Sequence, residues 1–353
     1  MTELTQIPVS KETRQQLRQL SYKGETYDAL IKRIINFKQK VFNNNIVTSQ
    51  TPFRLPLGGG STDLPEYYTK NNGGFWISGA INHYTHIILK NRFEEESKFV
   101  WSKTEYASKT TQFTHPILRA VFAKYNLTKH IELVSIGDLP ARIGLGSSGT
   151  FTVGLLNAIH KFLKIEVTPQ QLAEEAYEIE RFTLGRKVGK QDQYVATYGG
   201  LRKYYITHDG IVTSEPVNTH IPTFEKWLLL FYINQRQITM EEAATAMSNT
   251  DHEKISTISI KSLKSLENNN FQQYGQLLDE HWKIKSKYQP SLFASFITLA
   301  KQHGAIGGKL CGAGGGGCIL LVCPPEHQTS VIEQLNPAIH IPFNFTPFGS
   351  EVS

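Results

Sequence analysis

The sequence predicts an α+β protein in which strands of a mixed sheet and amphipathic helices form two lobes. Residues 131–136 alternate between apolar and polar in the manner of a strand, and apolar residues at helical spacing follow at 151–163. Strand patterns also occur at 75–89, which we interpret as two strands, and at 227–233, whereas 114–125 favours a helix. The 353 residues are enough for two lobes, each with its own core.

The composition is typical of an ordinary soluble globular protein. Hydrophobic residues make up 40% and charged residues 19% of the chain, and the net charge of +6 suits an anionic partner such as a nucleotide or a sugar phosphate. The three cysteines lack zinc-type spacing, so we expect reduced core residues: Cys311, Cys318 and Cys323. No signal-peptide pattern and no membrane-spanning run occurs, so we expect a cytoplasmic protein without a membrane partner.

Residues 1–45 differ from the rest and are interpreted as an N-terminal extension. A strand-like piece at 4–9 precedes Ser10, which is placed to start a first helix, and Gly24 separates it from a second helix at 27–35. This order loosely resembles ribbon-helix-helix antitoxin-like modules, which dimerise and bind DNA. A helical hairpin that packs on the main body or on a second subunit is favoured, because moderate basicity is a weak sign of DNA binding. Nucleic acid is thus expected only through this extension, if at all, and a homodimer stays open.

A glycine- and serine-rich loop at 138–150 joins the strand at 131–136 to the helix that follows. Unpaired backbone N–H groups and the positive end of the helix dipole converge at such a point, and glycines let the backbone approach an anion. The loop therefore favours a phosphate-binding site, although a tight turn without a ligand is the alternative.

A second stretch, 51–64, carries Arg54 on a strand that ends in three glycines and then presents Ser61, Thr62 and Asp63. An aspartate on such a loop can accept hydrogen bonds from the hydroxyls of a polyol, and the arginine could neutralise a transferring phosphate or hold the aspartate. In the alternative interpretation, Asp63 caps a short helix at 64–68.

Two further carboxylates stand out after the central helix. Thr168 and Pro169 start another helix, near whose end Glu180 could bind a metal. A glycine-containing turn then delivers Asp192, which could orient and deprotonate a hydroxyl nucleophile. Taken singly, each carboxylate is more often a solvated or helix-capping residue.

The third glycine stretch, 308–322, enters a strand through four consecutive glycines. It indicates either a close approach to another loop or a position beside a ligand, and the sequence does not separate these. A Walker loop is excluded because no lysine followed by serine or threonine ends either glycine stretch. Residues 144–149 do fit the spaced glycines of dinucleotide folds, but a helix start replaces the required acidic residue about twenty positions later.

The three glycine stretches together resemble the GHMP kinases in order, spacing and length, over about residues 46–345. The residues at 52–64 and 189–194 resemble the motifs of one branch of this family, the D-glycero-D-manno-heptose 7-phosphate kinases, with fucose kinases as near relatives. These enzymes phosphorylate an anomeric hydroxyl.

The resemblance implies a two-lobed fold, with a ribosomal S5 domain 2-like N-terminal lobe at 46–217 and a ferredoxin-like α/β C-terminal lobe at 218–353. ATP would bind between the lobes together with Mg²⁺. The implied substrate is a sugar or sugar phosphate, with D-glycero-D-manno-heptose 7-phosphate as the expected acceptor and the 1,7-bisphosphate as the product. The alternatives are a kinase for fucose or galactose, a catalytically silent sugar sensor of the same fold, and a DNA-binding regulator acting through residues 1–45.

The resemblance also implies roles for individual residues. The catalytic residues would be Asp192 and Arg54, and the Mg²⁺ ligands would be Ser148 and Glu180. The ATP phosphates would bind Gly144, Leu145, Gly146, Ser147, Ser148, Gly149 and Thr150. The sugar side would be formed by Asp63, Gly60, Ser61, Thr62, Gly314 and Gly315.

Two positions depart from the family pattern: Gly149 stands where relatives usually carry alanine, and Pro56 is expected to interrupt the strand after Arg54. No cluster in the sequence marks a pocket for the phosphate of a heptose 7-phosphate. The candidates for it are Lys103, Arg119, Arg186, Lys187 and Lys190.

Overall fold

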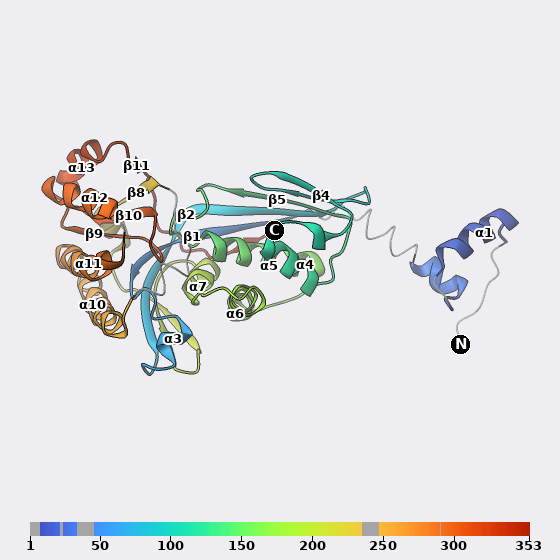
Figure 1. Cartoon of the computed structure of the whole chain (residues 1–353), viewed down its shortest axis with the longest axis horizontal. Coiled ribbons are helices and arrows are strands. Elements are labelled where there is room, and N and C mark those ends of the chain that lie inside the picture. Colours follow the sequence, from blue (N-terminus) through green and yellow to red (C-terminus); the bar gives the residue numbers. More distant parts are fainter. Residues whose placement is uncertain (1–7, 22–23, 34–45, 235–246, 290) are drawn as a thin grey trace.

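The computed structural model describes residues 8–21, 24–33, 46–234, 247–289 and 291–353. A larger lobe is built on an eight-stranded sheet and a smaller lobe on a four-stranded one (Figure 1). The α+β class is confirmed, and the larger sheet is mixed as predicted, because β3 and β5 pair in parallel and its other strand pairs are antiparallel.

The larger sheet has the strand order β12-β1-β2-β5-β3-β4, and β2 also pairs with β6, which pairs with β7. Its strands are β1 (Val47–Gly58), β2 (Gly74–Asn91), β3 (Ser97–Val100), β4 (Thr104–Ala107), β5 (Ile131–Gly137), β6 (Leu201–Ile206), β7 (Val212–Pro216) and β12 (Glu351–Val352). One face of this sheet is covered by helices (Figure 1), namely α4 (Pro116–Lys124), α5 (Ser147–Leu163), α6 (Pro169–Glu178) and α7 (Gln191–Tyr198). The chain also forms α3 (Pro65–Tyr68) and η1 (Thr110–Gln112) here.

Two sequence predictions about this sheet were wrong. Residues 75–89 belong to one strand, β2, because the polar pair Asn82 and His83 is accommodated as a bulge between the registers Pro52↔Tyr84 and Phe53↔Ile81. Pro56 does not interrupt β1, which continues to Gly58 with only a register shift after the proline.

The smaller sheet has the order β11-β8-β10-β9 and is antiparallel throughout. Its strands are β8 (Leu228–Asn234), β9 (Gly307–Leu310), β10 (Gly317–Val322) and β11 (Ile339–His340). The helical elements of this half of the chain are α8 (Ile221–Glu225), α10 (Asn249–Glu267), α11 (Phe271–Lys285), η3 (Ser286–Tyr288), α12 (Ser291–Gln302), η4 (Pro325–His327) and α13 (Gln328–Gln334). Residues 268–270 separate α10 from α11, and the side chain of Asn270 caps α11 by accepting the N–H of Gln273 at 3.0 Å.

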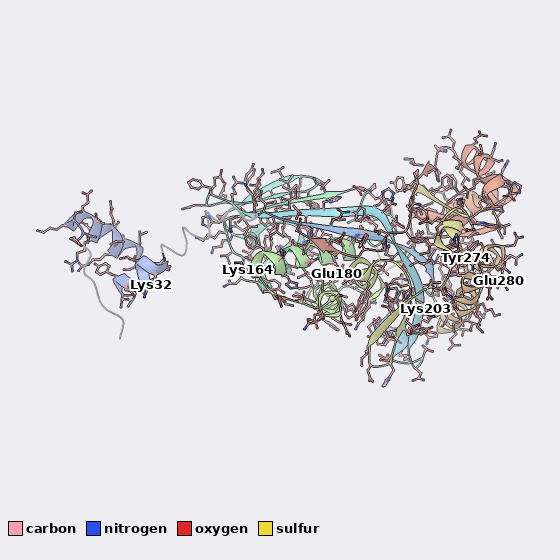
Figure 2. All side chains as sticks on the ribbon, turned by 180° about the vertical axis from the view of Figure 1, so that it is seen from behind. Lys32, Lys164, Glu180, Lys203, Tyr274 and Glu280 are labelled. Atoms are coloured by element: carbon pink, nitrogen blue, oxygen red, sulfur yellow. The ribbon has the colours of Figure 1, made fainter. Side chains whose placement is uncertain are left out.

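Side chains of the smaller lobe reach β1 where that strand approaches its end. The hydroxyl of Tyr274, on α11, donates to the carbonyl of Leu57 at 3.0 Å, and the N–H of Gly59 donates to the Ser259 hydroxyl, on α10, at 2.6 Å. Figure 2 shows Tyr274 among the helices of this lobe and Glu180 in the helical layer of the other. The end of β1 and the loop after it are therefore held by two helices of the smaller lobe.

The last residues of the chain return to the larger sheet, where β12 pairs with β1. All three cysteines are buried and free, as predicted. Within the residues that the structure describes, no helix is long and apolar enough to cross a membrane.

The N-terminal extension is described in part. Helix α1 (Lys11–Leu20) begins as predicted, with the Ser10 hydroxyl accepting the N–H of Thr13 at 3.0 Å, and residues 27–33 are helical. The two pieces contact each other, because Arg18 donates to the Tyr27 hydroxyl at 3.0 Å. The predicted strand at 4–9 and the end of the predicted helix at 27–35 lie mostly outside the described residues, which include 8–9 and 27–33 of them.

Candidate active site

The glycine-rich loop between β5 and α5 has the backbone of an anion-binding site. Gly144 and Gly146 adopt the left-handed conformation, with φ of 84° and 79°, and α5 starts directly after Gly146 without a side-chain cap. The first N–H groups of a 17-residue helix are therefore open to an anion at its positive end. Leu145 and Thr150 are fully buried, so these two could reach a phosphate only through the backbone.

Ser148 and Glu180 lie together beside the start of α5, as the metal prediction requires. The Ser148 hydroxyl donates to Glu180 Oε2, and Gln193 donates to Glu180 Oε1 at 2.9 Å. Glu180 sits on a π-helical turn, η2 (Ile179–Thr183), which continues α6, and such turns recur at functional sites. Burial raises the pKa of Glu180 above its usual range, although hydrogen bonds from Ser148 and Gln193 oppose this shift.

Arg186 occupies the same cluster, a position that the sequence did not predict. Its Nη1 donates to the Ser148 hydroxyl at 2.8 Å and to Glu180 Oε2 at 3.1 Å. The Ser148 hydroxyl and the Glu180 carboxylate are oxygen ligands, which hard divalent cations prefer. The positively charged guanidinium of Arg186 occupies the position beside both of them. The residues present therefore fit Mg²⁺ held by Ser148, Glu180 and nucleotide phosphates.

Arg54 and Asp192 form an ion pair beside the loop at 144–150, which is called the phosphate loop below after its predicted role. Arg54 Nε donates to Asp192 Oδ1 at 2.7 Å, and Arg54 Nη1 donates to the carbonyl of Gly144 at 2.8 Å. The loop also packs on this pair, because a Cβ on Gly146 would lie 2.8 Å from Arg54 Cγ and a Cβ on Gly149 would lie 2.7 Å from Asp192 Cβ. Gly149 is needed here because even an alanine would displace Asp192.

Asp63 lies next to Asp192 but is held differently. Its Oδ2 accepts the N–H of Gln191 at 2.8 Å, which places the carboxylate at the start of α7 rather than at the start of α3. The predicted alternative, a cap for the helix at 64–68, is therefore wrong: Leu64 occupies that cap position without a side-chain bond. Burial raises the pKa of Asp63 to about 6, with the Gln191 bond opposing it and the Asp192 charge adding to it.

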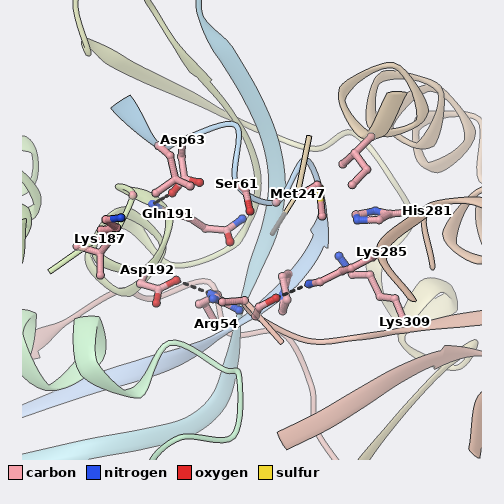
Figure 3. A pocket seen from close by; sticks show the side chains of 18 residues that line it. Arg54, Ser61, Asp63, Lys187, Gln191, Asp192, Met247, His281, Lys285 and Lys309 are labelled. Atoms are coloured by element: carbon pink, nitrogen blue, oxygen red, sulfur yellow. Dashed lines mark hydrogen bonds and ion pairs between the residues drawn. The ribbon is translucent and has the colours of Figure 1, made fainter. Parts of the chain in front are cut away.

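These two carboxylates line the same cavity as Arg54. Figure 3 shows Asp63, Gln191 and Asp192 on one side of it and His281, Lys285 and Lys309 on the other. Among the described residues, Nε2 of Gln191 is buried without a hydrogen-bond partner. A buried amide donor beside two carboxylates suits a ligand with several hydroxyl groups.

Only some of the residues predicted to bind the sugar line this cavity. Gly60 and Ser61 line the cavity, whereas the buried Thr62 hydroxyl is engaged by backbone, since it donates to the carbonyls of Gly59 and Phe75 at 2.8 and 2.7 Å. Gly314 and Gly315 pack against Gln289 and do not line this cavity.

The third glycine stretch makes the close approach to another loop that was one of its two predicted alternatives. A Cβ on Gly312 would lie 2.8 Å from the Cα of Gly144, and the N–H of Cys318 donates to the carbonyl of Ile143 at 2.9 Å, so this stretch packs directly on the phosphate loop. Gly312 and Ala313 also line the cavity.

Sequence reasoning missed the cationic side of the cavity. His281 and Lys285 lie in a helix whose pattern is merely polar, and Lys309 stands inside the third glycine stretch without a role assigned to it. Of the candidates for a phosphate pocket, Lys187 lines the cavity but is exposed, and Lys190 donates to Glu174 at 2.7 Å. Lys103 and Arg119 are exposed and do not line it.

Comparison with known proteins agrees with this geometry. Residues 112–200 match the GHMP kinases N terminal domain and residues 262–339 match the GHMP kinases C terminal domain. The chain thus matches both domains of the GHMP kinases, and its kinase relatives support a phosphotransferase with an alcohol group as acceptor. The resemblance of the three glycine stretches to this family is thereby confirmed.

Individual relatives are similar over most of the chain. A D-glycero-alpha-D-manno-heptose 7-phosphate kinase of Campylobacter jejuni is 29% identical over 317 residues, which are 82% of this chain and 93% of the relative. The mevalonate kinase of Pyrococcus abyssi is 23% identical, over 71% of this chain and 78% of its own length. The crystal structure of a D-glycero-D-manno-heptose 1-phosphate kinase from Bacteroides thetaiotaomicron has a TM-score of 0.73 and 25% identity, covering 87% of this chain and 98% of that one.

Proposed function

We propose that this protein transfers the γ-phosphoryl group of ATP to the anomeric hydroxyl of a sugar, with D-glycero-D-manno-heptose 7-phosphate as substrate and the 1,7-bisphosphate as product. The observation that carries the proposal is the meeting of Asp63, Asp192 and Arg54 at one cavity beside the phosphate loop. The names of the heptose phosphate kinases among its relatives support the choice of sugar.

In this proposal, the loop at 144–150 and the start of α5 bind the ATP phosphates through backbone N–H groups. Arg54 neutralises charge on the transferring phosphoryl group and fixes the orientation of Asp192. Asp63 and the amide of Gln191 bind sugar hydroxyls. Positioning and electrostatics supply most of the rate, because phosphoryl transfer passes through a loose transition state.

The reaction step is an in-line displacement. The anomeric oxygen forms a bond to the γ-phosphorus while the bond from that phosphorus to the β,γ-bridging oxygen breaks, and ADP leaves with the electron pair. The proton of the anomeric hydroxyl passes to the carboxylate of Asp192. Mg²⁺ held by Ser148 and Glu180 would neutralise charge on the β- and γ-phosphates.

A coupled ADP-release assay with Mg·ATP tests the proposal against a panel of heptose 7-phosphate, mannose 6-phosphate, fucose, galactose and mevalonate. Selective turnover of heptose 7-phosphate is the expected result. Turnover of a neutral sugar alone would keep the mechanism and change the substrate. No ADP release with any sugar of the panel, while ATP still binds, would favour a sugar sensor instead.

A further inference from the structure

An ion pair at the start of α7 lies outside the groups assigned to the reaction. The amino group of Lys190, the residue directly before α7, donates to both carboxylate oxygens of Glu174, on α6, at 2.7 Å. It also donates to the carbonyl of Gly210, in the turn between β6 and β7, at 2.7 Å. These three acceptors use all three donors of the ammonium group, and the Lys190 side chain is only 8% exposed. The start of α7 is therefore fixed to two neighbouring elements of the larger lobe.

Tyr194 attaches α7 to the same carboxylate one turn further along. Its hydroxyl donates to Glu174 Oε1, and its N–H donates to the carbonyl of Lys190 at 3.1 Å. Lys190 and Tyr194 are four positions apart, so they share one face of the helix. Because α7 has only eight residues, its placement depends on contacts such as these rather than on its own stability. Glu174 therefore restricts both the position of α7 and its rotation about its own axis.

Asp192 lies on the other face of the same turn. At 3.6 residues per turn, a residue two positions after Lys190 lies about 200° round the helix axis from it. On that face Asp192 accepts the bond from Arg54, and the N–H of the preceding Gln191 donates to Asp63. A rotation of α7 would therefore displace Asp192 and also the N–H group that holds Asp63.

We propose that Lys190 and Glu174 are positioning residues, which set the rotation of α7 and thereby the orientation of Asp192 toward the acceptor hydroxyl. Both side chains are described by the structure and neither lines the cavity, so they act through Asp192 and not on the substrate. This inference rests on the proposed function and deepens it, because it identifies what holds the group that receives the hydroxyl proton. The alternative is an ion pair that contributes only to the stability of the fold.

The first measurement compares the steady-state kinetics of the natural protein and Lys190→Met, which removes the charge and keeps the stem of the side chain. The kcat should fall about tenfold to a hundredfold, with the KM for ATP changed less than about twofold, because misplacing a reacting group by about 1 Å can cost about 10²-fold in rate. The matched control is Lys301→Met. Lys301 also donates to both oxygens of a carboxylate, that of Asp279, at 2.8 Å, but on helices of the smaller lobe. The control should keep its kcat, and an unchanged kcat in Lys190→Met would overturn the inference.

The second measurement combines Lys190→Met with Asp192→Asn and follows single turnovers. A residue that acts only through the carboxylate of Asp192 has nothing left to position once that carboxylate is gone. The rate of the double variant should therefore lie within about twofold of the rate of Asp192→Asn alone. An ion pair that only stabilises the fold would lower the rate by the same factor in both backgrounds. That additive result would contradict the positioning role.

The third measurement needs no turnover and so separates this inference from the kinase proposal. Hydrogen exchange of peptides that cover residues 190–198 should be at least about tenfold faster in Lys190→Met, because the N–H of Gln191 loses its fixed place against Asp63. Lys301→Met should leave this exchange unchanged. Unchanged exchange in Lys190→Met would refute the inference whatever the activity. Faster exchange in a protein that releases no ADP would support the attachment of α7 and contradict the kinase activity.

A second variant covers the case in which Lys190→Met does not fold. Glu174→Gln keeps one acceptor oxygen for Lys190 and removes the negative charge. It should show the same fall in kcat, the same loss of effect in the Asp192→Asn background and the same faster exchange. A Glu174→Gln protein with natural kcat and natural exchange would overturn the inference.

Discussion

Arg54 Nε lies 2.7 Å from Asp192 Oδ1, and this ion pair joins strand β1 to the first turn of α7 across 138 positions of sequence. The same guanidinium bonds the carbonyl of Gly144, so the pair is tied to the phosphate loop. In the proposed function, the group that orients the acceptor hydroxyl is therefore connected through Arg54 to the loop that binds the phosphates.

Asp192→Asn should abolish most of the turnover while leaving ATP binding intact. The amide keeps the size of the side chain but cannot take the hydroxyl proton, and loss of a general base typically costs about 10²–10⁴-fold in kcat. Steady-state ADP release and a nucleotide titration check this. Asp209→Asn is the control, because Asp209 is 67% exposed. Near-normal turnover of Asp192→Asn would mean that positioning alone drives the reaction.

Arg54→Lys should lower kcat by about tenfold or more although the charge is kept. The planar guanidinium donates to Asp192 and to the Gly144 carbonyl from two different nitrogens. Lysine has a single amino group and cannot reproduce this geometry. Arg202→Lys is the matched control, since Arg202 also makes two bonds, both to Ser214 at 3.2 Å on β7. Equal kcat in the two variants would show that this geometry is not needed.

Asp63 should make both stability and sugar binding depend on pH. Its folded pKa of about 6 lies above the unfolded value, so the native protein binds the extra proton between about pH 4 and 6. This carboxyl therefore lowers the free energy of unfolding as pH rises through that window, by up to about 3 kcal/mol.

Asp63→Asn should accordingly be more stable than the natural protein at pH 7.5, with the difference closing near pH 4. Its KM for the sugar should nevertheless rise, because the amide offers fewer acceptor positions than the carboxylate. Denaturant unfolding at several pH values and steady-state kinetics measure the two effects. A less stable variant at pH 7.5 would contradict the assigned pKa.

Glu180→Gln should raise the Mg²⁺ concentration needed for half-maximal activity about tenfold, with the sugar KM unchanged. The substitution removes the carboxylate that accepts from Ser148 and would bind the cation. A magnesium titration of activity measures this. The neighbouring Glu178 is exposed, so Glu178→Gln is the control. An unchanged magnesium requirement in Glu180→Gln would remove Glu180 from the metal site.

Gly149→Ala should reduce kcat because its Cβ would lie 2.7 Å from Asp192 Cβ. Overpacking of this kind costs about 1–3 kcal/mol of stability. Gly154→Ala is the matched control on the same helix, where the Cβ would lie 2.7 Å from the Thr51 hydroxyl. The two variants should lose similar stability, measured by thermal unfolding, but only Gly149→Ala should lose turnover. Equal turnover would show that Asp192 tolerates displacement.

The sequence predicted the parts of the site that have local signatures. Loop 144–150 combines glycines with a helix start, and Arg54, Asp63 and Asp192 each sit beside glycines, so their types and spacing pointed to phosphate and hydroxyl chemistry. Other features depend on strand register, which no short stretch of sequence reveals. These are the hydrogen bonds from the Thr62 hydroxyl to backbone carbonyls and the bulge at Asn82.

The cationic side of the cavity could not be predicted in the same way. His281 and Lys285 have the i, i+4 spacing of many solvated helix faces, and only packing of α11 against β9 buries them beside Lys309. Arg186 was predicted only as a candidate for a phosphate pocket, and its contact with Glu180 depends on the π-helical turn η2. In both cases, long-range packing decides whether a charged side chain is solvated or belongs to a site.

The most direct test of the central claim is the position of the new phosphate. Phosphorus NMR of heptose 7-phosphate incubated with the protein and Mg·ATP should reveal a second sugar phosphate whose signal couples to the anomeric proton, formed in equal amount to ADP. A new phosphate coupled to any other carbon-bound proton, or no new phosphate while ATP and the sugar both bind, would contradict the assignment as an anomeric sugar kinase.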